Sequence, residues 1–187
     1  MLYVSWDPIL IGISFVVAFI ASFVALDSAA KIRTSNLRSA LFWRICGGST
    51  LGMGIWSMHF VGMLAMKMPI VMHYDIALTI ASFWVAIIAA TLAINVAVSK
   101  EKLPFRRLLL ATFILSSGVV TMHSLGMLAL TDYLVLYWDK TRLLFSIVIA
   151  FIACGVALWL AFGHQLSRHG AFINHVFAAL VMGITIC

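Results

Sequence analysis

The segment IALTIASFWVAIIAATLAINVAV, Ile76 to Val98, decides the fold, because it carries no charged side chain along its whole length. A helix needs about 20 mostly apolar residues to cross the hydrocarbon core of a bilayer. The rest of the chain has the same character: 64% of its 187 residues are hydrophobic and 10% are charged. A soluble domain has roughly 25% charged residues. The composition therefore indicates an integral membrane protein.

Other apolar runs of similar length lie on both sides of this segment. Transmembrane β-strands would show segments of about ten residues with alternating polarity, and these runs do not alternate. We therefore predict an all-α polytopic transmembrane helix bundle that occupies residues 1–187 and leaves no soluble domain. The predicted spans are Ile9–Leu26, Ala40–Met66, Ile76–Val98, Phe105–Leu130 and Leu143–Phe162, followed by part of a sixth, Ala171–Cys187.

The basic residues predict the orientation of the bundle, because short cytoplasmic loops carry an excess of Lys and Arg. Three of the twelve fall in connections that we place outside: Lys67, Lys140 and Arg142. The other nine flank the alternate connections, predicted to be cytoplasmic: Lys31, Arg33, Arg38, Arg44, Lys100, Lys102, Arg106, Arg107 and Arg168. The N-terminus is then outside, and its apolar run is retained as a helix, since no basic residue precedes it as in a signal peptide.

The basic residues argue against a nucleic-acid-binding protein, and the cysteines argue against a redox or metal-binding cysteine motif. The net charge of +6 comes from basic residues beside the spans and forms no long patch with interleaved aromatics, so nucleic acid is not an expected partner. Cys46, Cys154 and Cys187 are isolated within apolar runs and show no CxxC spacing. We interpret them as buried small hydrophobic residues and not as a redox or metal motif.

An internal repeat marks the candidate site. MHFVGMLA, Met58–Ala65, is matched by MHSLGMLA, Met122–Ala129, and each copy ends an even-numbered predicted span. Both histidines are therefore expected near the outer face of the membrane. Residues four apart share one face of a helix, so His59 should project with Met63 and His123 with Met127. Gly52 and Trp56 lie on the same stripe as His59.

The glycines of the repeat, Gly62 and Gly126, are expected to let a neighbouring helix approach closely, as small residues do in membrane bundles. A histidine inside a span is costly to leave unpaired and faces the bundle interior or a cavity. Imidazole together with soft thioethers favours copper among the transition metals. The candidate metal ligands are His59, Met63, His123, Met127, Met58 and Met122. The simpler alternative is that the histidines only form an interhelical hydrogen bond.

These motifs resemble the MHYT domain, a bacterial membrane module named for its Met-His-Tyr-Thr signature. The resemblance implies a sensor that binds copper through Met and His and detects a diatomic gas, oxygen, carbon monoxide or nitric oxide. It further implies seven helices, three motif copies and a bacterial inner-membrane location. The expected output is a fused cytoplasmic domain such as a cyclic-di-GMP cyclase or phosphodiesterase, or a kinase, so this chain itself is not expected to be an enzyme.

The sequence departs from that signature in two ways. Phe60 and Ser124 stand where the signature has tyrosine, so neither motif supplies a phenol. VMGITIC, Val181–Cys187, aligns with TLGMGIW, Thr50–Trp56, so a third Met-His is expected after one further residue beyond Cys187. We therefore expect this chain to be a C-terminally truncated MHYT domain.

The remaining histidines are weaker candidates. His73 follows Met72 in an outer connection, off the register of the repeat, and is a further possible ligand. His164, His169 and His175 are expected on the cytoplasmic side, away from the motifs. A copper transporter or a haem-binding redox protein is the alternative function, since Met and His also ligate haem. The sequence leaves the oligomeric state open, a homodimer included.

Overall fold

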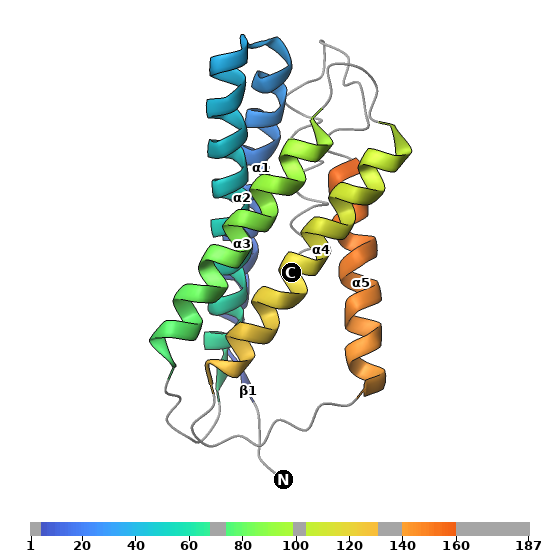
Figure 1. Ribbon diagram of the computed structural model, residues 1–187. Coiled ribbons are helices and arrows are strands. Elements are labelled where there is room, and N and C mark those ends of the chain that lie inside the picture. Colours follow the sequence, from blue (N-terminus) through green and yellow to red (C-terminus); the bar gives the residue numbers. More distant parts are fainter. Residues whose placement is uncertain (1–4, 68–73, 99–103, 131–139, 160–187) are drawn as a thin grey trace.

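The computed structural model describes residues 5–67, 74–98, 104–130 and 140–159. Among these residues the chain forms five helices and two very short strands, which confirms the predicted all-α fold. Consecutive helices pack side by side and antiparallel (Figure 1). The predicted partial sixth span, 171–187, lies outside the described residues. The elements are β1 (Ser5–Trp6), α1 (Pro8–Thr34), α2 (Leu37–Ala65), β2 (Met66–Lys67), α3 (Ile76–Ala97), α4 (Phe105–Leu128) and α5 (Lys140–Leu158).

Three of the described helices are long and apolar enough to cross a membrane by themselves: Pro8–Ile32 in α1, Ile76–Ala97 in α3 and Phe105–Leu128 in α4. Helix α2 has 29 residues, which at 1.5 Å per residue gives a length of about 43 Å. It is less apolar because glycines and hydroxyl side chains replace large hydrophobic residues along it. These glycines pack against α1 and α3, so α2 lies between two neighbouring helices of the bundle.

Close contacts between small residues hold the helices together. A methyl group on Gly48 of α2 would lie 2.5 Å from Cα of Thr91 in α3, and one on Gly52 would lie 2.6 Å from Cα of Ile87. A methyl group on Gly54 would instead meet the side-chain Cβ of Ala21 in α1. Close backbone-to-backbone approach, as between α2 and α3, is how membrane helices gain packing energy without a hydrophobic driving force between them.

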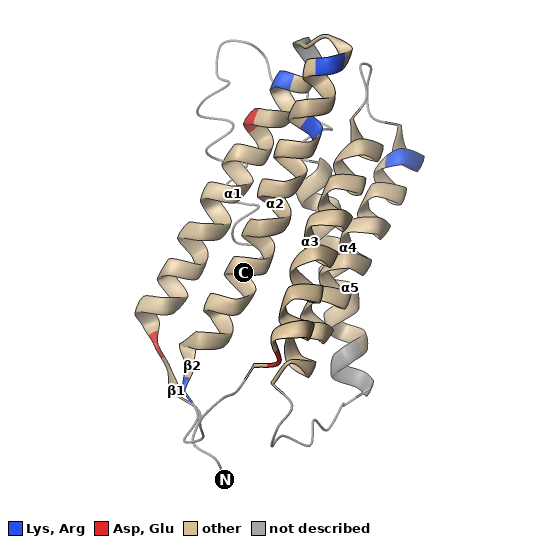
Figure 2. Cartoon of the chain, turned by 60° about the vertical axis from the view of Figure 1, so that its left-hand side comes forward, with Lys and Arg blue, Asp and Glu red and all other residues tan. Residues whose placement is uncertain are grey.

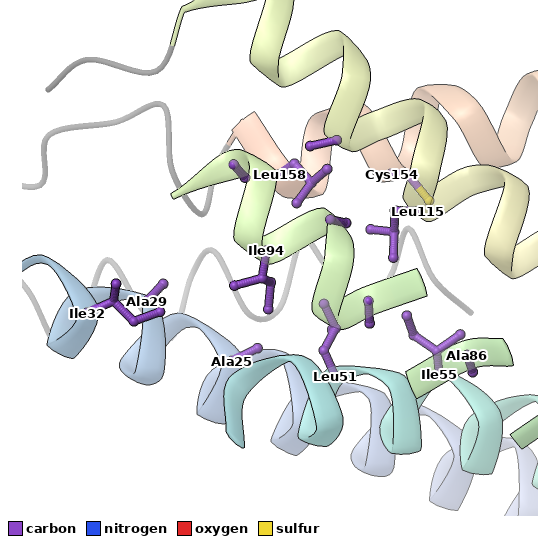
Figure 3. Close-up of a cluster of buried hydrophobic side chains, with 14 of the residues drawn as sticks. Ala25, Ala29, Ile32, Leu51, Ile55, Ala86, Ile94, Leu115, Cys154 and Leu158 are labelled. Carbon is purple, nitrogen blue, oxygen red and sulfur yellow. The ribbon is translucent and has the colours of Figure 1, made fainter. Parts of the chain in front are cut away.

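Larger apolar side chains fill the space between α2, α3 and α4. Figure 3 shows Leu51 and Ile55 of α2 facing α3, with Ile55 next to Ala86, and Leu115 of α4 and Cys154 of α5 on the far side of α3. Cys154 is 7% exposed and unpaired, which confirms its predicted packing as a small hydrophobic residue, whereas Cys46 is only half-buried and Cys187 lies outside the described residues.

The lower end of the bundle in Figure 1 is fixed by capped and cross-linked helix ends. Asp7 caps α1 through a hydrogen bond that its Oδ1 accepts from the Ile9 N–H (3.0 Å), and Asp75 caps α3 through Leu78 (2.9 Å). The Asp7 N–H donates to the Ala65 carbonyl (2.9 Å), and the Asp75 N–H donates to the Ala129 carbonyl (2.8 Å). At this end α1 is therefore tied to α2, and α3 to α4.

Charged residues are segregated along the bundle (Figure 2). Lys31 lies near the end of α1, Arg38 near the start of α2 and Arg106 at the start of α4, whereas Lys67 lies at the opposite end of the bundle and forms a 2.9 Å ion pair with Asp7. This distribution follows the predicted division of the connections. The assignment of the Lys67 end to the outside stays a prediction.

Candidate metal centre

The two repeated histidines meet at the Lys67 end of the bundle. His59 lies less than two turns from the end of α2, and His123 lies at the equivalent place in α4. Their ring centroids are 4.8 Å apart, with the ring planes at 63°. The sequence placed them at the same depth, and the structure brings them into contact. Elsewhere along their length α2 and α4 contact each other little.

Gly126 provides the space for the imidazole of His59. A Cβ at this position would lie 2.8 Å from Nε2 of His59 and 3.2 Å from Cδ2. The prediction that Gly126 permits close approach is therefore confirmed, and what approaches is the histidine itself. Gly62 differs, because its added Cβ would find its nearest neighbour, Ser14 Oγ of α1, 4.0 Å away. The expected close approach at Gly62 was wrong, since no atom needs that space.

His59 has an unmet hydrogen-bonding demand. Its Nε2 is buried, and no hydrogen-bond partner for it exists among the residues that the structure describes. His123, by contrast, is exposed. An unpaired buried polar atom costs about 1–3 kcal/mol. The simple interhelical hydrogen bond between the two histidines, the alternative to ligation, is not formed at this nitrogen.

The six candidate ligands separate by helix face. Met63 and Met127 each follow a histidine by four residues and share its face. Met63 is 7% exposed and Met127 is half-buried. Met58 and Met122 directly precede the histidines, and successive residues of a helix point about 100° apart. Met122 accordingly lies in the buried core cluster at 1% exposure. The geometry favours Met63 and Met127 as partners of the histidines.

Aromatic rings surround the first motif. Trp56 packs against Phe60 (centroids 4.5 Å apart) and against Phe83 of α3 (5.3 Å), and its Nε1–H donates to Ser82 Oγ (3.0 Å). Together with Gly52 this places the predicted stripe of α2 against α3. Phe60 also lies 5.5 Å from His59 and 6.1 Å from Tyr74, measured between ring centroids.

Sequence reasoning missed Tyr74, Ser82 and Phe83, which the fold brings to the motif end. The only sequence signal was the Met72-His73-Tyr74 triplet, where attention fell on His73. His73 and Met72 lie outside the described residues, as do His164, His169 and His175.

The donor set at this end fits a copper ion. In the described ranges no cluster of three or more His, Cys, Asp or Glu side chains exists, so a metal here would rest on the two imidazoles completed by thioethers. Nitrogen and thioether sulfur ligands suit copper, in particular Cu(I). The buried, unpartnered Nε2 of His59 is the observation that supports this fit. His59 and His123 would hold the ion, with Met63 and Met127 on the same faces.

The fold and this site define an integral membrane helix bundle, built around two copies of one sequence unit, with paired histidines at one end. Comparison with known proteins agrees: the chain belongs to the MHYT family, described as a bacterial signalling protein N terminal repeat, which matches residues 52–111 and 117–173. The two matched stretches confirm the internal repeat. No solved structure matches the chain.

Three curated bacterial proteins are similar to the chain. The bifunctional diguanylate cyclase/cyclic di-GMP phosphodiesterase MucR of Pseudomonas aeruginosa is 41% identical over 186 residues, covering 100% of this chain and 27% of its own length. The signaling protein YkoW of Bacillus subtilis is 30% identical, covering 99% and 23%. The cyclic di-GMP phosphodiesterase NbdA of Pseudomonas aeruginosa is 32% identical, covering 82% and 19%. The chain thus spans about a quarter of these relatives, and its family match is to the signalling repeat and not to a catalytic domain.

Proposed function

We propose that this chain is the sensor part of a bacterial membrane signalling protein, and that it holds copper with His59 and His123 to detect a diatomic gas. Its output would be a cytoplasmic domain that makes or degrades cyclic di-GMP, as the names of two similar proteins describe for those proteins. The observation that carries the proposal is the contact between the two motif histidines, one of which keeps a buried nitrogen without a partner.

Two helix pairs meet at the proposed site. The first pair is α1 and α2, joined at this end by the Asp7–Ala65 hydrogen bond, the β1–β2 pairing and a hydrogen bond from Ser14 Oγ to the Met58 carbonyl (3.1 Å). The second pair is α3 and α4, joined by the hydrogen bond between Asp75 and Ala129. His59 belongs to the first pair and His123 to the second.

This arrangement couples ligand binding to helix packing. When bound, copper would supply an open coordination position for a diatomic molecule. Both imidazoles must be held at fixed distances from one point, so their separation constrains the ends of α2 and α4. Gly48 and Gly52, together with the hydrogen bond from Trp56 to Ser82, hold α2 against α3, so a changed separation of the imidazoles would act on helices that are already packed together. A ligand that favours one separation shifts the population of two helix arrangements and signals toward the opposite end.

The test is copper binding by the intact full-length protein. His59→Ala and His123→Ala should each remove most of the copper, because losing one imidazole leaves an incomplete shell. His169→Ala is the matched control and should bind as the parent protein does, since the sequence places His169 on the other side of the membrane. Equal copper in the His59→Ala and His169→Ala proteins, with both folded, would refute the site.

The same preparation tests the alternative functions. A haem protein would show a Soret absorption band, which copper alone does not produce. A copper transport path needs ligands distributed through the membrane depth, whereas the two histidines of the described helices gather at one end. No observation on the structure favours transport or haem over the sensor.

A further inference from the structure

A second buried polar atom without a partner lies at the motif end of the bundle. In the described part of the chain four buried side-chain nitrogen or oxygen atoms lack a hydrogen-bond partner. Ser22 Oγ and Arg44 Nε lie farther along α1 and α2, toward the basic end. The other two are His59 Nε2 and the hydroxyl oxygen of Tyr74. Two such atoms at the same end of the bundle indicate a binding site for a small polar ligand.

The backbone fixes Tyr74 at the junction of α3 and α4. Tyr74 directly precedes Asp75, whose N–H donates to the Ala129 carbonyl of the α4 terminus (2.8 Å) and whose side chain caps α3. The Asp75 carbonyl also accepts a hydrogen bond from Thr79 Oγ1 (2.7 Å). These three bonds hold the residue next to Tyr74 in place, so the phenol is presented from a rigid point at the end of the helix that carries His123.

The ring of Phe60 links the ring of Tyr74 to that of His59. The centroid of the Tyr74 ring lies 6.1 Å from that of Phe60, and Phe60 in turn lies 5.5 Å from His59. The ring end of Phe60, Cζ, is 3.6 Å from the position of a Cβ on Gly126. Tyr74, Phe60, His59 and Gly126 therefore form one cluster that joins α2, the start of α3 and the end of α4. Phe60 itself brings no polar atom to the cluster.

The chemistry of the phenol decides its role. A tyrosine hydroxyl has an ordinary pKa of about 10, so it keeps its proton at neutral pH and serves as a hydrogen-bond donor. A buried hydroxyl that makes no bond costs about 1–3 kcal/mol, and a native site retains one where a ligand or water completes it. Tyrosine contributes this donor on a side chain with few rotatable bonds.

We propose that Tyr74 donates a hydrogen bond to a small oxygen-containing ligand held beside His59, and that it is a specificity-determining residue of the site. This inference rests on the proposed function for the ion and adds to it a residue outside both motifs. The acceptor is either a bound diatomic molecule or a water molecule that occupies its place. The site would then bind more tightly the diatomic molecule whose outer atom accepts a hydrogen bond from Tyr74 more strongly.

The experiment compares Tyr74→Phe with the parent full-length protein after loading with Cu(I) under anaerobic conditions. Carbon monoxide is the probe, and its infrared stretching frequency reports hydrogen bonding to its oxygen. Tyr74→Phe should retain the copper content, shift the stretch to higher frequency and bind nitric oxide up to about tenfold more weakly, which corresponds to the loss of one hydrogen bond of up to about 1.4 kcal/mol. If a water molecule is the acceptor, the carbon monoxide stretch stays unchanged. The copper affinity, measured by competition with a chelator, then falls in Tyr74→Phe instead.

Trp84→Phe is the control, because Trp84 is 55% exposed on the outside of α3 and loses an N–H without touching the cluster. It should leave copper, the stretch and nitric oxide affinity as in the parent protein. The copper-free Tyr74→Phe protein should melt at the parent temperature or above it, since the removed hydroxyl has no partner.

Three results would overturn the inference, and they separate it from the proposed function. A lower melting temperature of copper-free Tyr74→Phe would show that the hydroxyl already bonds within the protein. An unchanged stretch, nitric oxide affinity and copper affinity would show that the phenol contacts no ligand. In both cases His59 and His123 keep their proposed role. Failure of the parent protein to take up copper would instead remove the proposed function, and this inference with it.

Discussion

Gly126→Ala tests the site with one methyl group. The added Cβ would lie 2.8 Å from Nε2 of His59, which is about 0.6 Å inside the ordinary contact distance of 3.4 Å. Metal–ligand distances in a working site hold within about 0.2 Å. The imidazole must therefore move by several times that tolerance, and we expect the copper affinity of the intact protein to fall roughly 10–100-fold.

The fold should survive this substitution. Alanine is favoured over glycine inside a helix by about 1 kcal/mol, while overpacking costs about 1–3 kcal/mol. The atom that must yield is the end of a side chain and not backbone, so the net loss stays at or below about 2 kcal/mol. A thermal melt of the copper-free protein measures this change separately from the metal affinity.

The repeat supplies a matched control. Gly62 occupies the equivalent position of the first motif, but a methyl group there would have its nearest neighbour, Ser14 Oγ, 4.0 Å away. Gly62→Ala should keep its copper and gain up to about 1 kcal/mol of stability. Competition with a chelator of known copper affinity compares the two variants. Equal copper affinities of the Gly62→Ala and Gly126→Ala proteins would refute the reasoning, because the expected displacement of the His59 imidazole would then not affect copper binding.

Three further outcomes follow from the fold. Gly48→Ala should lower the melting temperature strongly, because its Cβ meets the Thr91 backbone at 2.5 Å, whereas Gly12→Ala, with no atom within 4 Å, should not lower it. The Lys67 ammonium, followed by the Ile9 N–H, lowers the pKa of Asp7 below its ordinary 3.8, so this carboxylate stabilises the fold above about pH 4 and the contribution is lost as pH falls through the lowered pKa. Asp7→Asn should therefore melt earlier than the parent protein at pH 7, and the difference should shrink as the pH falls through the lowered pKa of Asp7. An impermeant thiol reagent added outside should label a single cysteine placed at Lys67 and not one at Arg106; the reverse pattern would overturn the predicted orientation.

The apolar pattern predicted the helices but not all of their ends. The run Ile76–Val98 coincides with α3, which ends at Ala97. Helix α1, predicted to end at Leu26, continues to Thr34. The pattern stopped at Asp27 because polar residues follow, yet those residues stay helical. Lys31 forms a 2.6 Å ion pair with Asp27 one turn earlier, and Ser28 packs against Gly47 of α2.

The candidate site was predictable only where it is repeated. Duplication of the motif singled out His59 and His123, and helix periodicity placed Met63 and Met127 beside them. Tyr74 is not part of the repeat, and its position depends on the hydrogen bond from Asp75 to Ala129, which joins residues far apart in the sequence. No local pattern carries that information. Contacts of this kind follow from the packing of α3 on α4.

The repeated units are alike in sequence and unlike in surroundings. Gly126 faces His59, whereas its counterpart Gly62 faces Ser14 of α1. His59 is accordingly enclosed between helices, and His123 is exposed. A shared ligand would therefore be desolvated mainly on the His59 side, where an unpaired nitrogen makes binding most favourable. The sequence repeat singles out the two histidines, and their different surroundings make them unequal: in the proposed site His59 would bind from inside the bundle, and His123 from its open side.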